Sequence, residues 1–426
     1  MHIGFAVFGT RGDIGPLSWM ASALLQRGHR VTFFVNPHFA HIPKEPLAFV
    51  GDAAAERLQV VEVGDPWDPK DIVAQKEALD PRKVWTTFFM PQLPAFVRAQ
   101  RQVHANDPLD GIVAHIWTYG AVLAALADGI PFGFATLQPI TWLSASLPAR
   151  LDAWDMPQWL RRPVMGTFFP WVVRRCFDPP LRQAAVVLGV DLAALGASPF
   201  FGAWEQAACH LGLWDNAFRP LQDDDPSGAV LTGFALEPSQ TPLDDELDAF
   251  CRRHRPWVMG LGSALPLHFQ QPYLALARAT DEPMVLVGAD RTTLTEELGA
   301  LPSHIHVVDY APYASLFRLA RGVLHHGGVG TVAQALDAGV PQAVLGFGND
   351  MFDNGERVQE MGCGVVGDGR KVTPKKLRRM LARLREDDVI GRAKEVQGQR
   401  PAPTAWTDVA CVALETAFAK RAKPSA

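Results

Sequence analysis

The sequence has few cysteines and no excess of positive charge. Its 426 residues include five cysteines, which lie far apart and form no CxxC pair. This spacing predicts a reduced protein without a zinc ribbon. The 40 Lys and Arg residues are outnumbered by 45 Asp and Glu residues, so the net charge is -5. Because binding to a nucleic-acid backbone requires a broad basic field, we expect no nucleic acid as a partner.

Long apolar runs are also absent. No stretch approaches the ~20 apolar residues that a membrane-spanning helix needs. The N-terminal sequence MHIGFAVFGTRGD is apolar, but it has neither a basic leader nor a small-residue cleavage site. We therefore expect a first β-strand there, not a signal peptide, and a cytoplasmic protein. A peripheral contact with the inner face of a membrane remains compatible with this expectation.

Strand-like and helix-like segments alternate along most of the chain. An apolar run at Ile3–Phe8, a glycine loop, a helical stretch at Leu17–Arg27 and a second apolar run at Arg30–Val35 together predict a βαβ unit. The alternation starts again at Trp257–Leu261. We predict an α/β protein with two doubly wound parallel sheets. The expected parts are an N-terminal acceptor-binding domain over 1–221, a linker over 222–242, a C-terminal nucleotide-sugar-binding domain over 243–402, and a helix over 403–426 that crosses back. Within the linker, the sequence LTGF could still form a strand.

One strand-to-helix junction carries residues suited to an anionic ligand. The segment Gly322–Thr331 begins as a strand and ends as a helix, with three glycines, a threonine and two histidines at the junction. Glycines let the backbone approach a ligand, and the N-terminus of a helix favours negative charge. A tight turn would explain the glycines but not the paired histidines. The segment has neither GxxxxGK[ST] nor GxGxxG, which argues against a nucleotide hydrolase and a dehydrogenase.

The stretch LHHGGVGTVAQALDAGVPQAVLGFGNDMFDNGERVQEMGCGV resembles the C-terminal signature of glycosyltransferases with the GT-B fold, in the UDP-glycosyltransferase-like superfamily. Within that superfamily it is most similar to the branch of sterol, glycopeptide and rhamnolipid glycosyltransferases, and especially to the rhamnosyltransferases of rhamnolipid synthesis. GTRGDIGPL and DYAPYASLF resemble the same branch. The resemblance implies two Rossmann-like domains that face each other across a cleft. It also implies inverting transfer of a sugar from a UDP- or dTDP-linked donor, without a metal or other cofactor.

The resemblance also implies roles for single residues. His325 should contact the donor diphosphate, and Asp350 should accept hydrogen bonds from sugar hydroxyls. Met351 stands where the family usually has glutamine, and Gly355 where it has alanine. Because a thioether is a poor hydrogen-bonding group, Met351 would suit a deoxy sugar such as rhamnose. The remaining implied contacts are Gly327, Gly328, Gly330, Thr331 and Ser263 at the phosphates and Tyr310 and Ala311 at the pyrimidine base.

Asp13 follows the first strand and is the candidate catalytic residue. Transfer to a hydroxyl group needs a general base, and in the resembled branch this loop carries an aspartate or a histidine in that role. Asp13 precedes Ile-Gly-Pro, so it could instead cap the first helix. The residues alone favour neither the general base nor the helix cap, and the resemblance favours the general base. A free aspartate, with a pKa of about 3.9, is a poor base for an alcohol, so Asp13 would act as the new bond forms.

An aromatic, proline-rich stretch over Gln138–Phe177 breaks the alternation of strands and helices, so we expect it to be irregular. We also expect it to build an acceptor site for a lipid, sterol, polyketide or aromatic aglycone. Packing in the core explains part of this stretch equally well. Its tryptophans and arginines could also rest on an anionic membrane surface. The acidic clusters Asp223–Asp225 and Asp244–Asp245 are interpreted as solvated surface, not as a metal site. The candidate acceptor residues are His115, Trp142, Phe168 and Trp171.

Two other functions remain open at this point. One is a non-catalytic protein on the same fold that binds a nucleotide-sugar or a lipid, and the other is a sugar-nucleotide epimerase. The fold alone does not decide between them.

Overall fold

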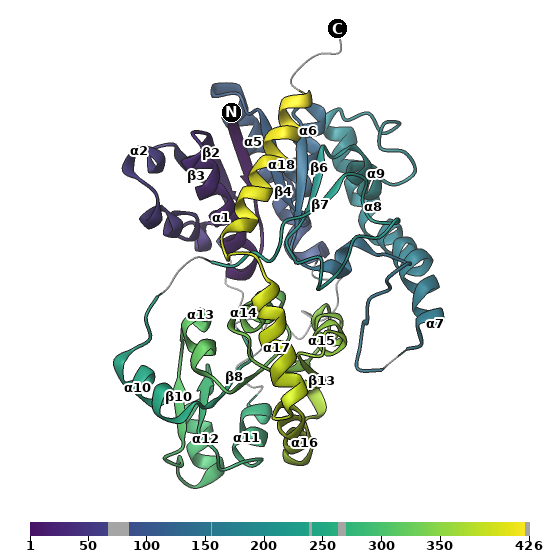
Figure 1. The fold of residues 1–426 in the computed structure, drawn as a ribbon. Helices are drawn as coiled ribbons and strands as arrows, with labels where there is room; N and C mark the ends of the chain where they lie inside the picture. The colour runs from purple at the N-terminus through teal and green to yellow at the C-terminus, as the bar shows by residue number, and fades with distance from the viewer. Residues whose placement is uncertain (67–84, 155, 238–240, 263–269, 422–426) are drawn as a thin grey trace.

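The chain is known from a computed structural model, which describes residues 1–66, 85–154, 156–237, 241–262 and 270–421. Two α/β lobes lie one above the other, with the N-terminal half of the chain in the upper lobe (Figure 1). Each lobe is built around one sheet, of seven strands in the first and six in the second. The expected fold class, with two doubly wound parallel-sheet domains, is confirmed.

The first sheet has the strand order β3-β2-β1-β4-β5-β6-β7, and all neighbouring strands are parallel. All residues of β1, β4 and β5 are buried. This burial on both faces is typical of a parallel sheet that helices cover on each side. The strands are β1 (His2–Ala6), β2 (Arg30–Val35), β3 (Leu58–Glu62), β4 (Gly111–His115), β5 (Phe132–Thr136), β6 (Cys209–Gly212) and β7 (Ala229–Leu231).

Helices cover both faces of this sheet. On one face, α1 (Arg11–Gln26) packs against the C-terminal helix α18 (Ala405–Arg421), which also contacts β6. On the other face, α5 packs against α6, α6 against α8 and α8 against α9. The remaining helices of this lobe are α2 (Asp52–Ala55), α5 (Leu93–Asn106), α6 (Tyr119–Ala127), α7 (Gln158–Pro163), the π-helical turn η6 (Val164–Phe168), α8 (Phe169–Leu188) and α9 (Pro199–Gln206).

The second sheet has the order β10-β9-β8-β11-β12-β13 and is also parallel throughout. Its strands are β8 (Trp257–Gly260), β9 (Met284–Val287), β10 (Ile305–Val308), β11 (Gly322–His325), β12 (Gln342–Gly346) and β13 (Gly364–Asp368). Its helices are α10 (Asp245–His254), α11 (Gln271–Ala277), α12 (Arg291–Leu298), α13 (Tyr313–Leu316), α14 (Val329–Ala338), α15 (Met351–Glu360), α16 (Pro374–Leu384) and α17 (Asp387–Gln399).

The last two helices join the lobes (Figure 1). Helix α17 packs against α14 in the second lobe, and α18 packs against α1 in the first. Between them, Arg400 pairs with Asp215 and stacks on Phe234, with its guanidinium 5.2 Å from the ring centroid. The indole N–H of Trp406 donates to the carbonyl of Leu236 at 3.0 Å. These contacts hold the crossing segment on the first lobe.

Three parts of the fold differ from the sequence-based expectation. Helix α1 begins at Arg11, well before Leu17, because Thr10 and Asp13 form a capping box. Strand β7 lies inside the range 222–242 that we assigned to a linker, so this range belongs partly to the first lobe. The aromatic stretch, expected to be irregular, is helical from α7 to α8. Pro170 stands in the first turn of α8, where its missing N–H removes no helical hydrogen bond. Among the described residues, no helix is long and apolar enough to cross a membrane.

Candidate active site between the two sheets

Each sheet has one point where its strand order reverses. These points lie between β1 and β4 in the first sheet and between β8 and β11 in the second. Helices leave neighbouring strands toward opposite faces there, which opens a crevice at the carboxyl ends of the strands. Asp13 and His115 lie at the first reversal, and Gly262 and His326 lie at the second. The topology therefore places the candidate base and the candidate phosphate loop where ligands bind in such folds.

His325, the predicted phosphate contact, is fully buried. Its Nε2 lies 3.0 Å from Oε1 of Gln342, and its Nδ1 accepts a hydrogen bond from the N–H of Gly327 at 3.1 Å. Burial lowers the pKa of this imidazole to about 3, so the ring is neutral. Both ring nitrogens are thus engaged inside the protein. His325 fixes the shape of the loop from behind and has no free nitrogen for a phosphate.

His326 is the residue that sequence reasoning missed. A Cβ at Gly262 would lie 2.5 Å from its Cε1, and a Cβ at Gly328 would lie 2.5 Å from its Nε2, so the ring packs between two glycines. Its Nδ1 is buried and has no hydrogen-bond partner among the described residues. Burial lowers its pKa to about 4, so it too is neutral. The paired histidines drew attention to this junction, but the pattern does not show which ring faces the crevice.

Gly327 brings the phosphate loop against the loop that precedes α15. Its φ of +96° is a conformation that favours glycine, and an added Cβ would lie 2.9 Å from the backbone oxygen of Met351. The side-chain amide of Asn354 donates to the carbonyl of Gly327 at 2.9 Å and to Oδ2 of Asp350 at 2.8 Å. The two loops predicted to hold the donor phosphates and the donor sugar are therefore tied together by one buried side chain.

The first turn of α14 is open toward the crevice. Gly328 is its N-cap residue, and the N–H groups at the start of a helix have no partners within it. A Cβ placed on Gly330 would meet no atom within 4 Å. Thr331 lies in the same turn and is half-buried. The predicted cradle thus presents free backbone donors beside an open space. Ser263, predicted to add a contact here, lies outside the described residues.

Asp350 lies at the start of α15, after Asn349, whose φ is +52°. Its carboxyl group is desolvated, and this burial raises its pKa to about 6. The negative charge of Asp13 also raises this pKa. Asp350 belongs to the second lobe and Asp13 to the first. The candidate sugar loop and the candidate base therefore lie within electrostatic reach of each other across the crevice.

The two departures from the family pattern have different structural consequences. The side chain of Met351 packs against the apolar core of the second lobe. A Cβ at Gly355 would lie only 2.5 Å from Cγ2 of Val366 and 2.9 Å from Cγ1 of Val344. These valine side chains occupy the space that an alanine methyl group would need. The glycine is therefore a packing requirement of this chain.

The sequence left open whether Asp13 caps the first helix or acts as a base, and its two carboxylate oxygens have different surroundings. Its Oδ2 accepts hydrogen bonds from the backbone N–H and the hydroxyl of Thr10, at 2.8 and 3.2 Å, so it does cap α1. Its Oδ1 lies 3.6 Å from Nε2 of His115. His115 is fully buried, with Nδ1 3.0 Å from the carbonyl oxygen of Phe8. Since a carbonyl can only accept, Nδ1 carries the proton. His115 therefore lies behind Asp13, which corrects the prediction that it lines the acceptor surface.

The loop after β10 contains the two residues predicted to hold the nucleobase. The ring of Tyr310 is 73% exposed, whereas Ala311 is buried in the core. Arg11, at the start of α1, forms a two-pronged ion pair with Glu45. The pKa of Arg11 is raised mainly by this pair, with a contribution from Tyr310. The start of α1 and the loop after β10 therefore approach each other, one from each lobe.

Comparisons with known proteins agree with this architecture. The family model for the Erythromycin biosynthesis protein CIII-like, C-terminal domain, matches residues 273–411. A sterol 3-beta-glucosyltransferase of Arabidopsis thaliana is 26% identical over 85% of this chain, which spans only 59% of that longer protein. Glycosyltransferase GtfE of Amycolatopsis orientalis is 27% identical over 98% of this chain and 97% of its own length. The solved structure of the kitacinnamycin glycosyltransferase covers 98% of the chain with a TM-score of 0.69 and 22% identity. The chain therefore has the GT-B fold, and the relatives that it matches over most of its length are glycosyltransferases.

The aromatic residues proposed as acceptor contacts are divided between core and surface. Trp142 is 3% exposed and packs edge-on against Trp214, with the ring centroids 4.6 Å apart, so it is a core residue and its prediction is corrected. Phe168 and Trp171 are 53% and 55% exposed and stack on each other with centroids 6.0 Å apart. They lie on the outer surface, because the stretch that carries them is a helix packed on the lobe.

A group of ion pairs joins the acceptor-side segment of the first lobe to α15. Arg161 binds both carboxylate oxygens of Glu356, at 2.5 and 2.9 Å, and is only 6% exposed. The backbone N–H of Arg150 donates to Oδ1 of Asp353 at 3.2 Å. We call these four residues the clasp. Since α15 begins at Met351, the clasp connects the segment before α8 to the helix that carries the sugar loop.

Breaking the clasp should destabilise the chain and weaken donor binding. In a Glu356→Gln variant, the buried Arg161 would lose its two-pronged charged contact with Glu356, which should cost about 1.5–3 kcal/mol. We expect a clear fall in melting temperature and a higher KM for the donor, because α15 loses its anchor. Glu386→Gln is the matched control, since Glu386 pairs with Arg383 on the exposed surface. Equal melting temperatures for the two variants would contradict the role of the clasp.

The acidic clusters serve the fold. Asp224 accepts hydrogen bonds from the hydroxyl of Ser144 and the N–H groups that follow it, and Asp225 forms a buried pair with Arg219. Asp244 caps α10. The interpretation as solvated surface is therefore wrong for Asp225, whose side chain is buried, whereas Asp224 and Asp244 are exposed. No group of three or more His, Cys, Asp or Glu side chains that could hold a metal ion occurs among the residues that the structure describes.

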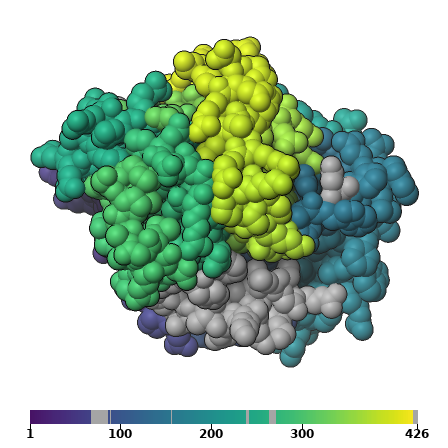
Figure 2. Space-filling model, turned by 90° about the horizontal axis from the view of Figure 1, so that it is seen from below, coloured from purple at the N-terminus to yellow at the C-terminus, as the bar shows by residue number. Residues whose placement is uncertain are grey.

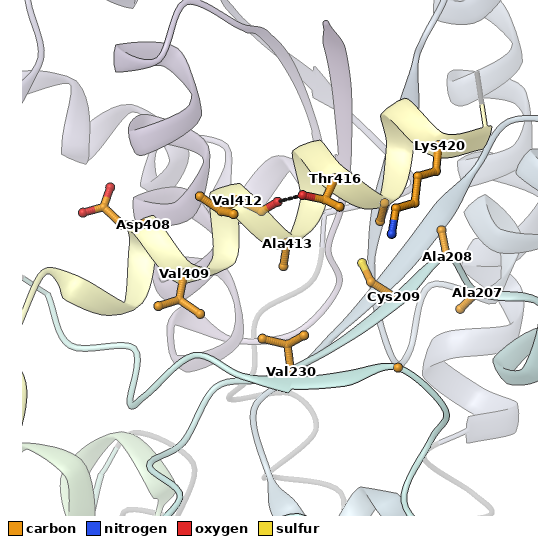
Figure 3. Close-up of a pocket in the computed structure, with 12 residues that line it drawn as sticks. Ala207, Ala208, Cys209, Val230, Asp408, Val409, Val412, Ala413, Thr416 and Lys420 are labelled. Carbon is orange, nitrogen blue, oxygen red and sulfur yellow. Dashed lines mark hydrogen bonds between the residues drawn. The ribbon is translucent and has the colours of Figure 1, made fainter. Parts of the chain in front are cut away.

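A groove of about 800 Å³ lies elsewhere, between α18 and the strands β6 and β7 (Figure 3). Strand β7 is the edge of the first sheet, and α18 covers its neighbour β6. Small and apolar side chains such as Ala208, Val230 and Val412 line the groove, with Asp408 and Lys420 at its two ends (Figure 3). None of the candidate site residues lines it, so it is separate from the crevice at the two strand reversals.

Proposed function

We propose that this chain transfers a sugar from a UDP- or dTDP-linked donor to a hydroxyl group of a hydrophobic acceptor, with inversion at the anomeric carbon and without a bound metal. The observation that carries the proposal is the placement of Asp13 at the strand reversal of the first sheet and of the loop after β11 at the reversal of the second, with the charge of Asp13 adding to the raised pKa of Asp350. A base on the acceptor side and a carboxylate on the donor side then face one reaction space. Relatives named for sterols support a hydrophobic acceptor.

Asp13 would act as the general base. Its Oδ1 is the oxygen left over from the helix cap, so it can take the proton of the acceptor hydroxyl. As that proton leaves, the acceptor oxygen bonds to the anomeric carbon and the bond from this carbon to the diphosphate breaks. Nε2 of His115, which carries no proton in the neutral ring, lies 3.6 Å behind Oδ1. It can accept the proton onward, which helps a weak carboxylate base.

The leaving diphosphate would be stabilised by the start of α14. The free N–H groups of its first turn and the dipole of the helix favour the growing negative charge. His326 is neutral, so it contributes a hydrogen bond and not a positive charge. Asp350 would accept hydrogen bonds from the hydroxyls of the donor sugar, and Met351 leaves the neighbouring position without a strong polar group. This arrangement favours a deoxy sugar such as rhamnose.

The proposal is tested by a donor panel followed by a transfer assay. Ligand binding raises the melting temperature, so a panel of UDP- and dTDP-sugars should identify one base and one sugar. Competition between deoxy and fully hydroxylated sugars tests the role of Met351. The nucleoside diphosphate should then be released only when an acceptor is present. Binding without release would indicate the non-catalytic alternative, and conversion of the donor sugar without an acceptor would indicate an epimerase.

Donor affinity should depend on pH through Asp350. The pKa of this carboxyl group is raised to about 6, so the charged form that best accepts hydroxyl hydrogen bonds exists mainly above pH 6. Affinity should therefore rise as the pH increases through 6 and fall as it decreases. Between pH 7 and pH 5, the donor Kd should increase by up to about tenfold, as one proton binds per site. Calorimetry at several pH values measures this, and an Asp350→Asn variant should show a flat profile.

A further inference from the structure

Four exposed aromatic side chains of the first lobe lie around the start of one long helical segment. Trp154 is 65% exposed, Trp159 74%, Phe168 53% and Trp171 55%. Trp154 precedes α7, and the other three lie on α7, η6 and α8. We call these four residues the aromatic ridge. Among the described residues, no tryptophan outside the ridge is exposed to this degree.

Packing of the lobe does not explain the ridge. The same helical segment already buries Met165, Val173 and Phe177 against the first lobe. The segment therefore has a buried side that packs on the lobe, and the side chains of the ridge are exposed to solvent. In Figure 1, α7 and the start of α8 lie at the flank of the molecule. Several large apolar side chains that face water along one segment, two of them stacked on each other, are unusual in a monomeric protein and indicate a surface that another structure covers.

Positive charge accompanies the ridge. Arg162, Arg174 and Arg175 are exposed on the same helical segment. Arg174 lies over the ring of Phe201, 5.4 Å from its centroid. Among the described residues, no carboxylate forms an ion pair with Arg162 or Arg175. The chain as a whole carries a net charge of -5, so this basic flank is a local feature. A surface with negative charge would complement it.

Tryptophans and arginines together match one kind of partner especially well. Tryptophan rings prefer the interface between lipid headgroups and acyl chains, and arginines bind anionic headgroups while their stems lie on apolar material. The rings of the ridge project from a helix exterior and line no cavity among the described residues, so the ridge is suited to enter a soft surface. We propose that the aromatic ridge docks this chain on an anionic lipid bilayer.

Docking has a consequence for the reaction, which rests on the proposed function. The ridge is continuous with the clasp, because Arg161 lies on α7 between Trp159 and Phe168 and binds Glu356 on α15. Figure 2 shows this part of the first lobe beside the second lobe. A bilayer at the ridge would hold a hydrophobic acceptor near the crevice in which Asp13 and Asp350 meet.

The docking is tested with the full chain and vesicles of defined composition. We expect flotation with vesicles of phosphatidylcholine that contain 30% phosphatidylglycerol, much weaker binding to phosphatidylcholine alone, and loss of binding at high salt. A Trp154→Ser/Trp159→Ser double variant should bind at least about tenfold more weakly. Its melting temperature should be unchanged, since both rings are exposed. Phe49→Ser is the control, because Phe49 is 56% exposed but lies far along the chain in another element, 42–49.

Two results would overturn the proposal. One is equal vesicle binding by the wild-type chain and the double variant. The other is a wild-type dimer that the double variant converts to a monomer in light scattering, which would assign the ridge to a second copy of the chain. A transfer assay keeps this proposal apart from the proposed function. Vesicle binding without sugar transfer would support the docking and contradict the proposed function. Sugar transfer to a water-soluble acceptor without vesicle binding would support the proposed function and contradict the docking.

Discussion

Turnover of the Asp13→Asn variant should be about 10²- to 10⁴-fold lower than that of the wild type, the usual contribution of a general base. The substitution is informative because it separates the two roles of this side chain. The asparagine carbonyl oxygen can still accept the hydrogen bond from Thr10, so the cap on α1 is retained. Only the charge and the proton acceptor at Oδ1 are lost. Steady-state kinetics should show a fall in kcat, with donor binding by thermal shift close to that of the wild type.

A second variant tests whether His115 acts through Asp13. His115→Gln should lower kcat by about tenfold and change the pH profile, because the proton acceptor behind Oδ1 is lost. In the double variant Asp13→Asn/His115→Gln, kcat should be only slightly lower than in Asp13→Asn, since the effects of coupled residues are not additive. Asp13→Ala, which also removes the cap, should have a lower melting temperature than Asp13→Asn by the equivalent of about 1 kcal/mol. Near-normal kcat in Asp13→Asn would refute the assignment of the base.

The fold could be predicted from local sequence because its signals are local. Apolar runs such as Ile3–Phe8 and Gly322–His325 alternate with helical spacing, and this alternation defines a parallel α/β sheet. The signals fail where tertiary contacts decide the structure. Strand β7 is only three residues long and becomes a strand because it pairs with β6. The helical form of the aromatic stretch likewise depends on packing against the lobe, since its prolines argued locally for a loop.

The candidate site was predictable by position but not by orientation. The glycines after His325 identified the loop, because a backbone that closely approaches a ligand or another loop needs glycine in any fold. Which histidine faces the crevice depends on Gln342, which is brought beside His325 by the pairing of β11 with β12. The pairing of Asp13 with His115 and the clasp similarly join residues far apart in sequence. No periodicity or spacing in the sequence contains that information.

Substitution of Gly330 by alanine should raise stability and abolish most donor binding. Gly330 lies in the first turn of α14, where an added Cβ would meet no protein atom within 4 Å. Alanine is the better helix former by about 1 kcal/mol, so the melting temperature should increase slightly. The new methyl group would, however, occupy the open space beside the free N–H groups that are proposed to hold the diphosphate. A steric clash of this kind costs about 1–3 kcal/mol, or roughly 5- to 150-fold in Kd.

The matched control is Gly391→Ala in α17. Gly391 is also helical, and an added Cβ there likewise meets nothing within 4 Å, but it lies in a helix outside the crevice. Both variants should gain stability, and only Gly330→Ala should lose affinity for the nucleotide-sugar in calorimetry. This contrast removes folding as an explanation, because both glycines carry the same change in the same kind of backbone. If Gly330→Ala bound the donor as tightly as Gly391→Ala, the diphosphate could not lie against the first turn of α14, and the cradle would have to be placed elsewhere.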